Sequence, residues 1–270
     1  MTPPATLYCE RLGPADATRL IAFTHGIYGS GTNWRSIARQ VIARVPGWAA
    51  ALVDLRLHGR SAAGAPPHTV AACVADLQAL FAGLAAAGPP VVAAVGHSFG
   101  GKVVLGLDLP IRVILDSTPS ARPGAWDAPD NSVRAAWASL VALDRVWARR
   151  EDFVAALVAR GHAPAMAGWL AMNLGPTDGG LRLRLELDAI RALVTDYYAV
   201  DAWPAIEAAT GAIAMVVAEH GHTVSAADLA RLEHAPVAVT THVIPGAGHW
   251  LHLDAPAAVV EHVVAALRGG

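Results

Sequence analysis

The chain has 270 residues, of which 54% are hydrophobic and 16% charged, and its formal net charge is −2. This length fits one large domain, or one domain with an insertion, and such a hydrophobic content excludes a disordered chain. A net charge this close to zero also excludes the broad electrostatic field that favours binding to nucleic acid or anionic membranes. We therefore expect neither of these partners.

The first residues, MTPPATLYCER, lack a basic region followed by an apolar run. They predict no secretory signal and hence a cytoplasmic location. Cys9 and Cys73 match no metal or redox spacing and predict free, buried thiols. Residues 77–101 carry no charge and exceed the length of a bilayer span, but a Gly-Pro-Pro sequence at 88–90 interrupts them. We expect a helix, a turn and a strand there.

Short apolar runs alternate with helical patterns in the first part of the chain. Each run ends in glycine or polar residues, as strands buried on both faces do. The runs cover residues 20–26, 48–56, 91–98 and 112–119, and helical spacing occupies 32–45 and 69–88. Strand and helix in alternation predict right-handed crossovers and a mostly parallel sheet, that is, an α/β fold.

The alternation stops between residues 123 and 201, where tryptophan-rich helical stretches appear without a comparable strand. It resumes with strands at 211–221 and 237–246, a helix from about Ser225, and a last helix over 255–267. We therefore predict a core of residues 1–122 and 202–270 with a helical cap insertion over 123–201.

The sequence Gly96-His97-Ser98-Phe99-Gly100 satisfies the pattern G-x-S-x-G. It follows a predicted buried strand and precedes a helix, which is the context that a nucleophile elbow requires. Small flanking residues keep the strand and helix from colliding while the serine takes a strained conformation. Ser98 is therefore the predicted nucleophile, and the alternative is a glycine-rich turn with an incidental serine.

A serine nucleophile needs a base, and His249 follows the last predicted strand in the sequence PGAGHWLH. Its alternative is a structural loop histidine. His220, His222 and His252 have no third ligand at a usual metal spacing, so we expect them to be solvated and predict no metal site.

Two carboxylates at strand ends between Ser98 and His249 are candidates for the acid that orients the imidazole, Asp116 and Glu219. We favour Asp116 because its short side chain ends the strand directly after the elbow unit. Glu219 remains open as the alternative.

A tetrahedral intermediate also needs two donors, for which we predict the backbone N–H groups of Phe99 and Ile27. Several aromatic residues are candidate pocket walls, although core packing explains the tryptophans from the insertion equally well. These residues are Tyr28, Trp126, Trp137, Trp169 and Trp250.

Four motifs in order carry a family resemblance. They are HGIYGSGTNW (25–34), DLRLHGRS (54–61), GHSFGGK (96–102) and PGAGHWLH (245–252), joined by the cap segments NL at 173–174 and LRLRLELDAI at 181–190. Over nearly its whole length the chain resembles the α/β-hydrolase esterases of the bacterial YbfF type and their mitochondrial relatives.

The resemblance implies the α/β-hydrolase fold and hydrolysis of carboxylic esters of small to medium apolar acyl groups, with acyl-CoA thioesters open, without cofactor or metal. It also places the acid at Asp116, in a D-x-[SA]-P setting. Two departures keep Glu219 open: a short segment between Ser98 and Asp116, and an extra threonine before Pro119.

Asp54, Arg56, His58 and Ser61 of the second motif are expected to order a loop beneath the site. A different set, Arg145, Arg149 and Arg150, is a candidate for binding the phosphate of a CoA substrate, against a solvated helix face.

Other chemistries also use a serine triad, namely carbon–carbon bond hydrolysis, cofactor-free haloperoxidation and acyl transfer. A non-catalytic ligand-binding module is the alternative from another class. The sequence predicts no oligomeric state.

Overall fold

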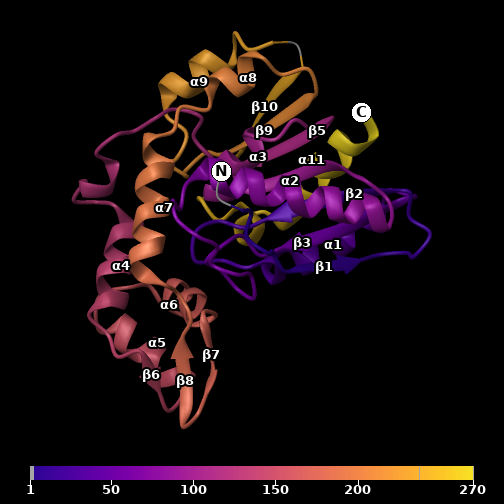
Figure 1. Cartoon of the computed structure of the whole chain (residues 1–270). Helices are drawn as coiled ribbons and strands as arrows, with labels where there is room; N and C mark the ends of the chain where they lie inside the picture. The colour runs from indigo at the N-terminus through magenta and orange to yellow at the C-terminus, as the bar shows by residue number, and fades with distance from the viewer. Residues whose placement is uncertain (1–2, 237, 270) are drawn as a thin grey trace.

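A seven-stranded sheet forms the centre of the protein in the computed structural model, which describes residues 3–236 and 238–269 (Figure 1). Its strand order is β1-β3-β2-β4-β5-β9-β10; β1 is antiparallel to β3, and the other neighbours are parallel. The strands are β1 (Cys9–Leu12), β2 (Arg19–Thr24), β3 (Trp48–Val53), β4 (Val91–His97), β5 (Ile111–Leu115), β9 (Ala212–Ala218) and β10 (Val239–Ile244). All six predicted strands are present, and β1 is an additional edge strand, of whose four residues two are charged.

Helices cover both faces of this sheet, as the crossover pattern predicts. Alternate residues of β2 enter two different cores: Leu20 and Ala22 pack on the side of α2 and α3, and Ile21 and Phe23 on the side of α1 and α11. The helices of this part are α1 (Arg35–Ile42), α2 (Val70–Ala87), α3 (Phe99–Leu105), α8 (Trp203–Glu207), α9 (Ala226–Leu232), α10 (Leu251–Asp254) and α11 (Pro256–Gly269), with a 3-10 turn at Gly31–Trp34. A second 3-10 turn, Ala125–Asp127, lies within residues 123–201.

One described helix, α2, is long and apolar enough to cross a membrane by length and composition. Within the fold its Asp76 accepts from the buried Arg56 guanidinium, with 2.6 Å between Oδ2 and Nε. The chain then turns and enters β4, so the predicted succession of helix, turn and strand is confirmed.

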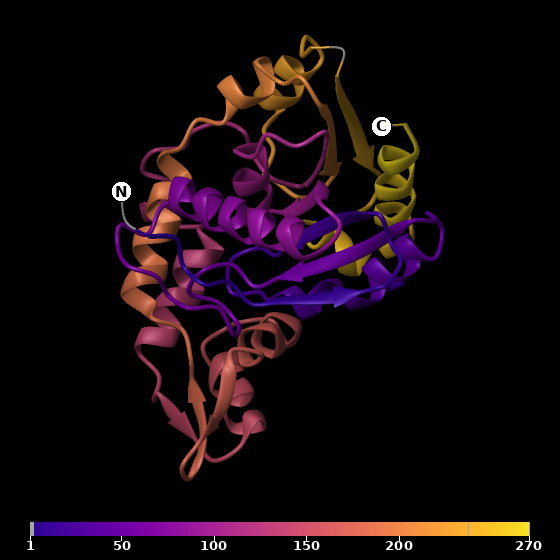
Figure 2. The ribbon, with the colours of Figure 1, turned by 45° about the vertical axis from the view of Figure 1, so that its right-hand side comes forward.

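The segment between residues 123 and 201 extends away from the main sheet (Figures 1 and 2). The expectation that it is entirely helical is wrong, because three short antiparallel strands pair in the order β6-β8-β7. β6 has only two residues and β7 contains Gly175 and Pro176, which hide a strand pattern. The elements are α4 (Ser132–Val141), β6 (Val146–Trp147), α5 (Arg150–Val158), α6 (Pro164–Ala171), β7 (Leu174–Thr177), β8 (Gly180–Leu183) and α7 (Leu187–Ala199). We call residues 123–201 the insertion.

Buried polar contacts attach the insertion to the sheet. The ammonium of Lys102, on α3, donates to the carbonyl oxygens of Ser120, Tyr197 and Val200 at 3.1, 3.1 and 2.9 Å. Burial lowers the pKa of Lys102 to about 8. The Asn173 amide donates to the Tyr28 carbonyl at 2.9 Å. These bonds hold the insertion over the carboxyl ends of the strands.

Candidate active site

Ser98 lies on a strained turn between β4 and α3. Its φ of 52° and ψ of −117° place it in the left-handed half of backbone space, where a side chain costs energy. A Cβ atom on Gly96 would collide with the Gly100 carbonyl, and one on Gly100 would lie 2.5 Å from the His25 carbonyl oxygen. The two flanking glycines are therefore required, and the turn has the geometry of a nucleophile elbow.

The imidazole of His249 contacts the carboxylate of Asp116. Nδ1 lies 2.6 Å from Asp116 Oδ2, and the Asp116 side chain is 0% exposed. The other oxygen, Oδ1, accepts from the Ala218 N–H at 3.1 Å, which fixes the carboxylate plane. With its Nδ1 proton donated to the carboxylate, the imidazole keeps Nε2 as an acceptor.

Glu219 takes a different direction from Asp116. One carboxylate oxygen accepts from the Gly246 N–H at 2.7 Å, and half of the side chain is exposed. The structure therefore brings Asp116, and not Glu219, to the histidine. Strand β5 ends directly beside β4, so Asp116, the residue that follows β5, reaches the imidazole that enters from the loop after β10.

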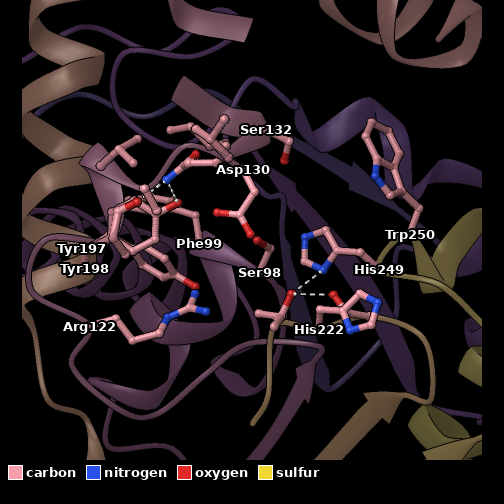
Figure 3. Close-up of a pocket in the computed structure, with 18 residues that line it drawn as sticks. Ser98, Phe99, Arg122, Asp130, Ser132, Tyr197, Tyr198, His222, His249 and Trp250 are labelled. Carbon is pink, nitrogen blue, oxygen red and sulfur yellow. Dashed lines mark hydrogen bonds between the residues drawn. The ribbon is translucent and has the colours of Figure 1, made fainter. Parts of the chain in front are cut away.

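Ser98 and His249 face one cavity (Figure 3). The hydrogen bonds between described residues include none from the Ser98 hydroxyl to the imidazole. Catalytic hydrogen bonds are often long without substrate and tighten in the substrate complex. Ser98 and His249 therefore line the same cavity without a hydrogen bond between their side chains in the described chain.

The two predicted oxyanion donors lie at the same cavity. Phe99 is the first residue of α3, so its N–H has no acceptor within the helix. Ile27 also lines the cavity, and its N–H donates to no other described residue. Both N–H groups thus remain available to a ligand.

Two buried imidazoles position the loop that carries Ile27. His58 Nε2 accepts from the Tyr28 N–H at 3.1 Å, and His25 Nε2 accepts from the Leu55 N–H at 3.0 Å. Burial lowers the pKa of His25 to about 4 and that of His58 to about 3, so both are neutral acceptors at neutral pH.

The rest of the DLRLHGRS motif orders the neighbouring loops, as the sequence predicts. Asp54 accepts from the N–H groups of Gly31 and Arg60 at 2.6 and 2.9 Å. Ser61 donates back to the Asp54 carbonyl at 2.5 Å and accepts from the Tyr8 N–H at 2.7 Å.

The cavity has two adjoining compartments of about 360 and 70 Å³. Both are lined by Ile27, Ser98, Ser132, Val133, His249 and Trp250. The smaller compartment adds the mainly apolar walls Tyr28, Met166 and Trp169. The larger one adds charged and polar walls, including Arg122, Asp130, Asn131, Tyr197, Tyr198 and His222. The smaller space is thus mainly apolar, whereas the larger one combines charged, polar and apolar walls.

A family model described as the alpha/beta hydrolase family matches residues 21–262. The chain belongs to this family. This α/β-hydrolase is 27% identical over 267 residues to the sn-1-specific diacylglycerol lipase ABHD11 of Danio rerio, covering 95% of this chain and 80% of that one. Lipase LipV of Mycobacterium tuberculosis is 38% identical over 101 residues, covering 37% of this chain and 35% of LipV.

Solved structures show the same fold. A marine microorganism esterase has a TM-score of 0.83 at 21% identity, covering 97% of this chain and 99% of that chain. E-2-(acetamidomethylene)succinate hydrolase has a TM-score of 0.77 at 23% identity, covering 98% and 96%. The predicted α/β-hydrolase fold and hydrolase class are thereby confirmed, and the finer resemblance to the YbfF type stays a prediction.

Of the predicted pocket walls in this α/β-hydrolase, Tyr28, Trp169 and Trp250 line the cavity. The prediction is wrong for Trp126 and Trp137. Their rings pack against each other with centroids 5.6 Å apart, and neither lines either compartment. Trp126, in a 3-10 turn, and Trp137, on α4, pack in the hydrophobic core of this part of the protein.

The expectation of solvated histidines is wrong for one of the three, His252, since His220 and His222 are both exposed. His252 is 6% exposed, and its ring lies 5.1 Å from that of Trp34 and 5.7 Å from that of Trp169. His222 also lines the larger compartment. Within residues 3–236 and 238–269, no group of three or more His, Cys, Asp or Glu side chains could hold a metal ion.

Two contacts of the catalytic histidine candidate escape sequence reasoning. His97 Nε2 donates to the His249 carbonyl at 2.7 Å, and burial holds the His97 pKa well below its usual value. Thr223 Oγ1 lies 2.9 Å from His249 Nδ1. His97 stands in the variable position of the elbow motif, the only signal that could have indicated it, and Thr223 lies in a loop without a motif.

Proposed function

We propose that the protein hydrolyses carboxylic esters through a triad of Ser98, His249 and Asp116. The observation that carries this proposal is the 2.6 Å contact between His249 Nδ1 and the buried Asp116 carboxylate, on the same cavity as the strained Ser98. The two relatives named above are lipases, and their names support the same reaction type.

In the acylation step, His249 Nε2 removes the Ser98 hydroxyl proton while the serine oxygen bonds to the ester carbonyl carbon. The N–H groups of Phe99 and Ile27 stabilise the resulting oxyanion. The ester C–O bond then breaks, and the imidazolium returns its proton to the departing alcohol oxygen. Asp116 keeps the imidazole oriented and stabilises its positive charge throughout.

In the deacylation step, His249 takes a proton from water, whose oxygen attacks the acyl carbon of the acyl-enzyme. The carboxylic acid leaves, and Ser98 recovers its proton. We assign the smaller compartment to the acyl group, because Tyr28, Met166 and Trp169 offer it apolar walls. The larger compartment then receives the alcohol.

Oxygen esters fit better than CoA thioesters, because the three candidate phosphate-binding arginines already have partners. Arg149 pairs with Asp152, Arg145 donates to the carbonyls of Leu183 and Leu185, and Arg150 donates to that of Ala171. This ion pair and these hydrogen bonds stabilise the fold of the insertion.

The test measures turnover of p-nitrophenyl esters of graded chain length by wild type and Ser98→Ala. We expect kcat/KM to fall at least about 10³-fold in the variant, because the nucleophile is lost. A fluorophosphonate probe should label Ser98 in the wild type only. Unchanged turnover in Ser98→Ala would refute the triad. No turnover of any ester or thioester would favour another serine-triad chemistry or a binding module.

A further inference from the structure

Arg122 enters the larger compartment from the loop between β5 and α4. Its backbone N–H donates to the Tyr198 carbonyl at 2.6 Å, and the carbon of its guanidinium lies 5.7 Å from the centre of the Tyr198 ring. In Figure 3 Arg122 and Trp250 lie on opposite sides of Ser98. Backbone and ring contacts thus fix a positive charge in the part of the cavity assigned to the alcohol.

The Arg122 guanidinium has no acceptor among the described residues. Among the described residues the guanidinium takes part in no side-chain hydrogen bond and no ion pair. Its Nε is shielded from solvent and has no partner there. By contrast, the buried Arg56 binds Asp76, and Arg112, whose Nε is likewise unpartnered, donates through Nη1 to the carbonyls of Leu105 and Leu107. A guanidinium on a cavity wall without an acceptor in the described chain is available to a ligand that supplies one.

We propose that Arg122 selects esters whose alcohol part carries a carboxylate. A planar guanidinium matches a carboxylate in two parallel hydrogen bonds, and the partly enclosed cavity strengthens the attraction. This inference rests on the proposed ester hydrolysis and names the substrate class of that same site.

The charges in the compartment favour a monoanion. Arg122 is opposed by Asp130, an exposed residue on the same cavity, and the two form no ion pair with each other in the described chain. The other titratable groups on this wall are Tyr197, Tyr198 and His222, together with His249. Arg122 supplies one fixed positive charge and Asp130 a negative one on the same cavity, so a ligand with a single negative charge fits better than a phosphate dianion.

The experiment uses acetate esters of hydroxyacids with one, three and five methylene groups between the ester oxygen and the carboxylate. Each is paired with the neutral primary amide of the same chain. All of them form the same acetyl-enzyme, so a difference in kcat/KM arises before deacylation. The readout is the ratio of kcat/KM for the acid to that for its amide, from released acetate.

We expect this ratio to exceed one in the wild type for at least one chain length. Arg122→Gln should lower it about 10- to 100-fold, as expected for hydrogen bonds to a charged group, and Arg122→Lys should restore part of it. Asp130→Asn should raise the ratio about two- to fivefold, because it removes an exposed like charge. Arg134→Gln is the matched control, an exposed α4 arginine that does not line the cavity, and should leave the ratio unchanged.

An equal ratio in wild type and Arg122→Gln at every chain length would overturn the proposal. A higher kcat/KM for acetate esters whose alcohol part carries a phosphate in place of the carboxylate would also overturn it. The esters that carry a neutral amide measure ester hydrolysis without carboxylate recognition. If they are hydrolysed and the ratio is unchanged, the role of Arg122 is refuted and the proposed ester hydrolysis is not. Absence of turnover for all esters instead refutes the proposed function.

Discussion

The two walls of the cavity are built by different physical means. On the sheet side, Ser98, Asp116 and the loop of His249 follow the carboxyl ends of β4, β5 and β10, so backbone hydrogen bonds determine where their side chains meet. On the insertion side, Met166 and Trp169 belong to α6, and Tyr197 and Tyr198 to α7, which side-chain packing and a few buried polar bonds hold in place. The positions of the reacting side chains therefore depend on the strand ends that precede them, whereas the shape of the cavity depends on tertiary packing.

The largest expected effect tests the sheet side directly. Asp116→Asn should lower kcat about 10⁴-fold, because the amide oxygen would keep the Ala218 N–H bond while the amide NH2 donates to Nδ1, which leaves the imidazole in the wrong tautomer. Glu219→Gln, the matched control one strand away, should stay within about twofold, since Glu219 accepts from the Gly246 N–H and lies 3.8 Å from His220 Nε2, both outside the proposed triad. Steady-state kinetics on one p-nitrophenyl ester decide. If only Glu219→Gln lost activity, the acid of the triad would be Glu219, the alternative that the sequence left open.

This division explains what the sequence could predict. Strand ends in a parallel sheet converge whatever the side chains are, so Ser98, Asp116 and His249 could be found from motif and order. Arg122, Asp130 and Thr223 stand in loops without a motif, and only the folded chain brings them to the cavity. Trp126 and Trp137 show the reverse error, because an aromatic side chain at helical spacing can fill a core or line a pocket.

A second pair of substitutions compares how tightly the two regions are packed. Gly100→Ala adds a methyl group 2.5 Å from the His25 carbonyl oxygen, so we expect the free energy of unfolding to fall by about 3 kcal/mol. Gly168→Ala, in the exposed interior of α6, meets no atom within 4 Å and should raise it by about 0.5–1 kcal/mol. Urea unfolding measures both. Equal changes would mean that the elbow tolerates a side chain and that its glycines are not required.

The smallest effect concerns His252, whose ring lies between Trp34 of the sheet side and Trp169 of the insertion. Burial lowers its pKa to about 4, and neither ring nitrogen has a partner among the described residues. The unfolded chain therefore binds a proton below about pH 6.5 that the folded chain refuses until about pH 4. Since the folded pKa is depressed, this contribution to stability is complete above pH 6.5 and is lost as the pH falls towards 4.

The same sign holds for His25, His58 and His97, so the free energy of unfolding should fall steeply between pH 6.5 and 4. Each such histidine contributes up to about 1.4 kcal/mol per pH unit. His252→Phe keeps an aromatic ring between the two tryptophans and removes one titrating group. Urea unfolding at pH 7 and 5 should show a shallower pH dependence by up to that amount, with little loss of stability at pH 7. An unchanged slope would mean that the ring is protonated or hydrated where it lies, and that the boundary between sheet and insertion is wetter than its burial indicates.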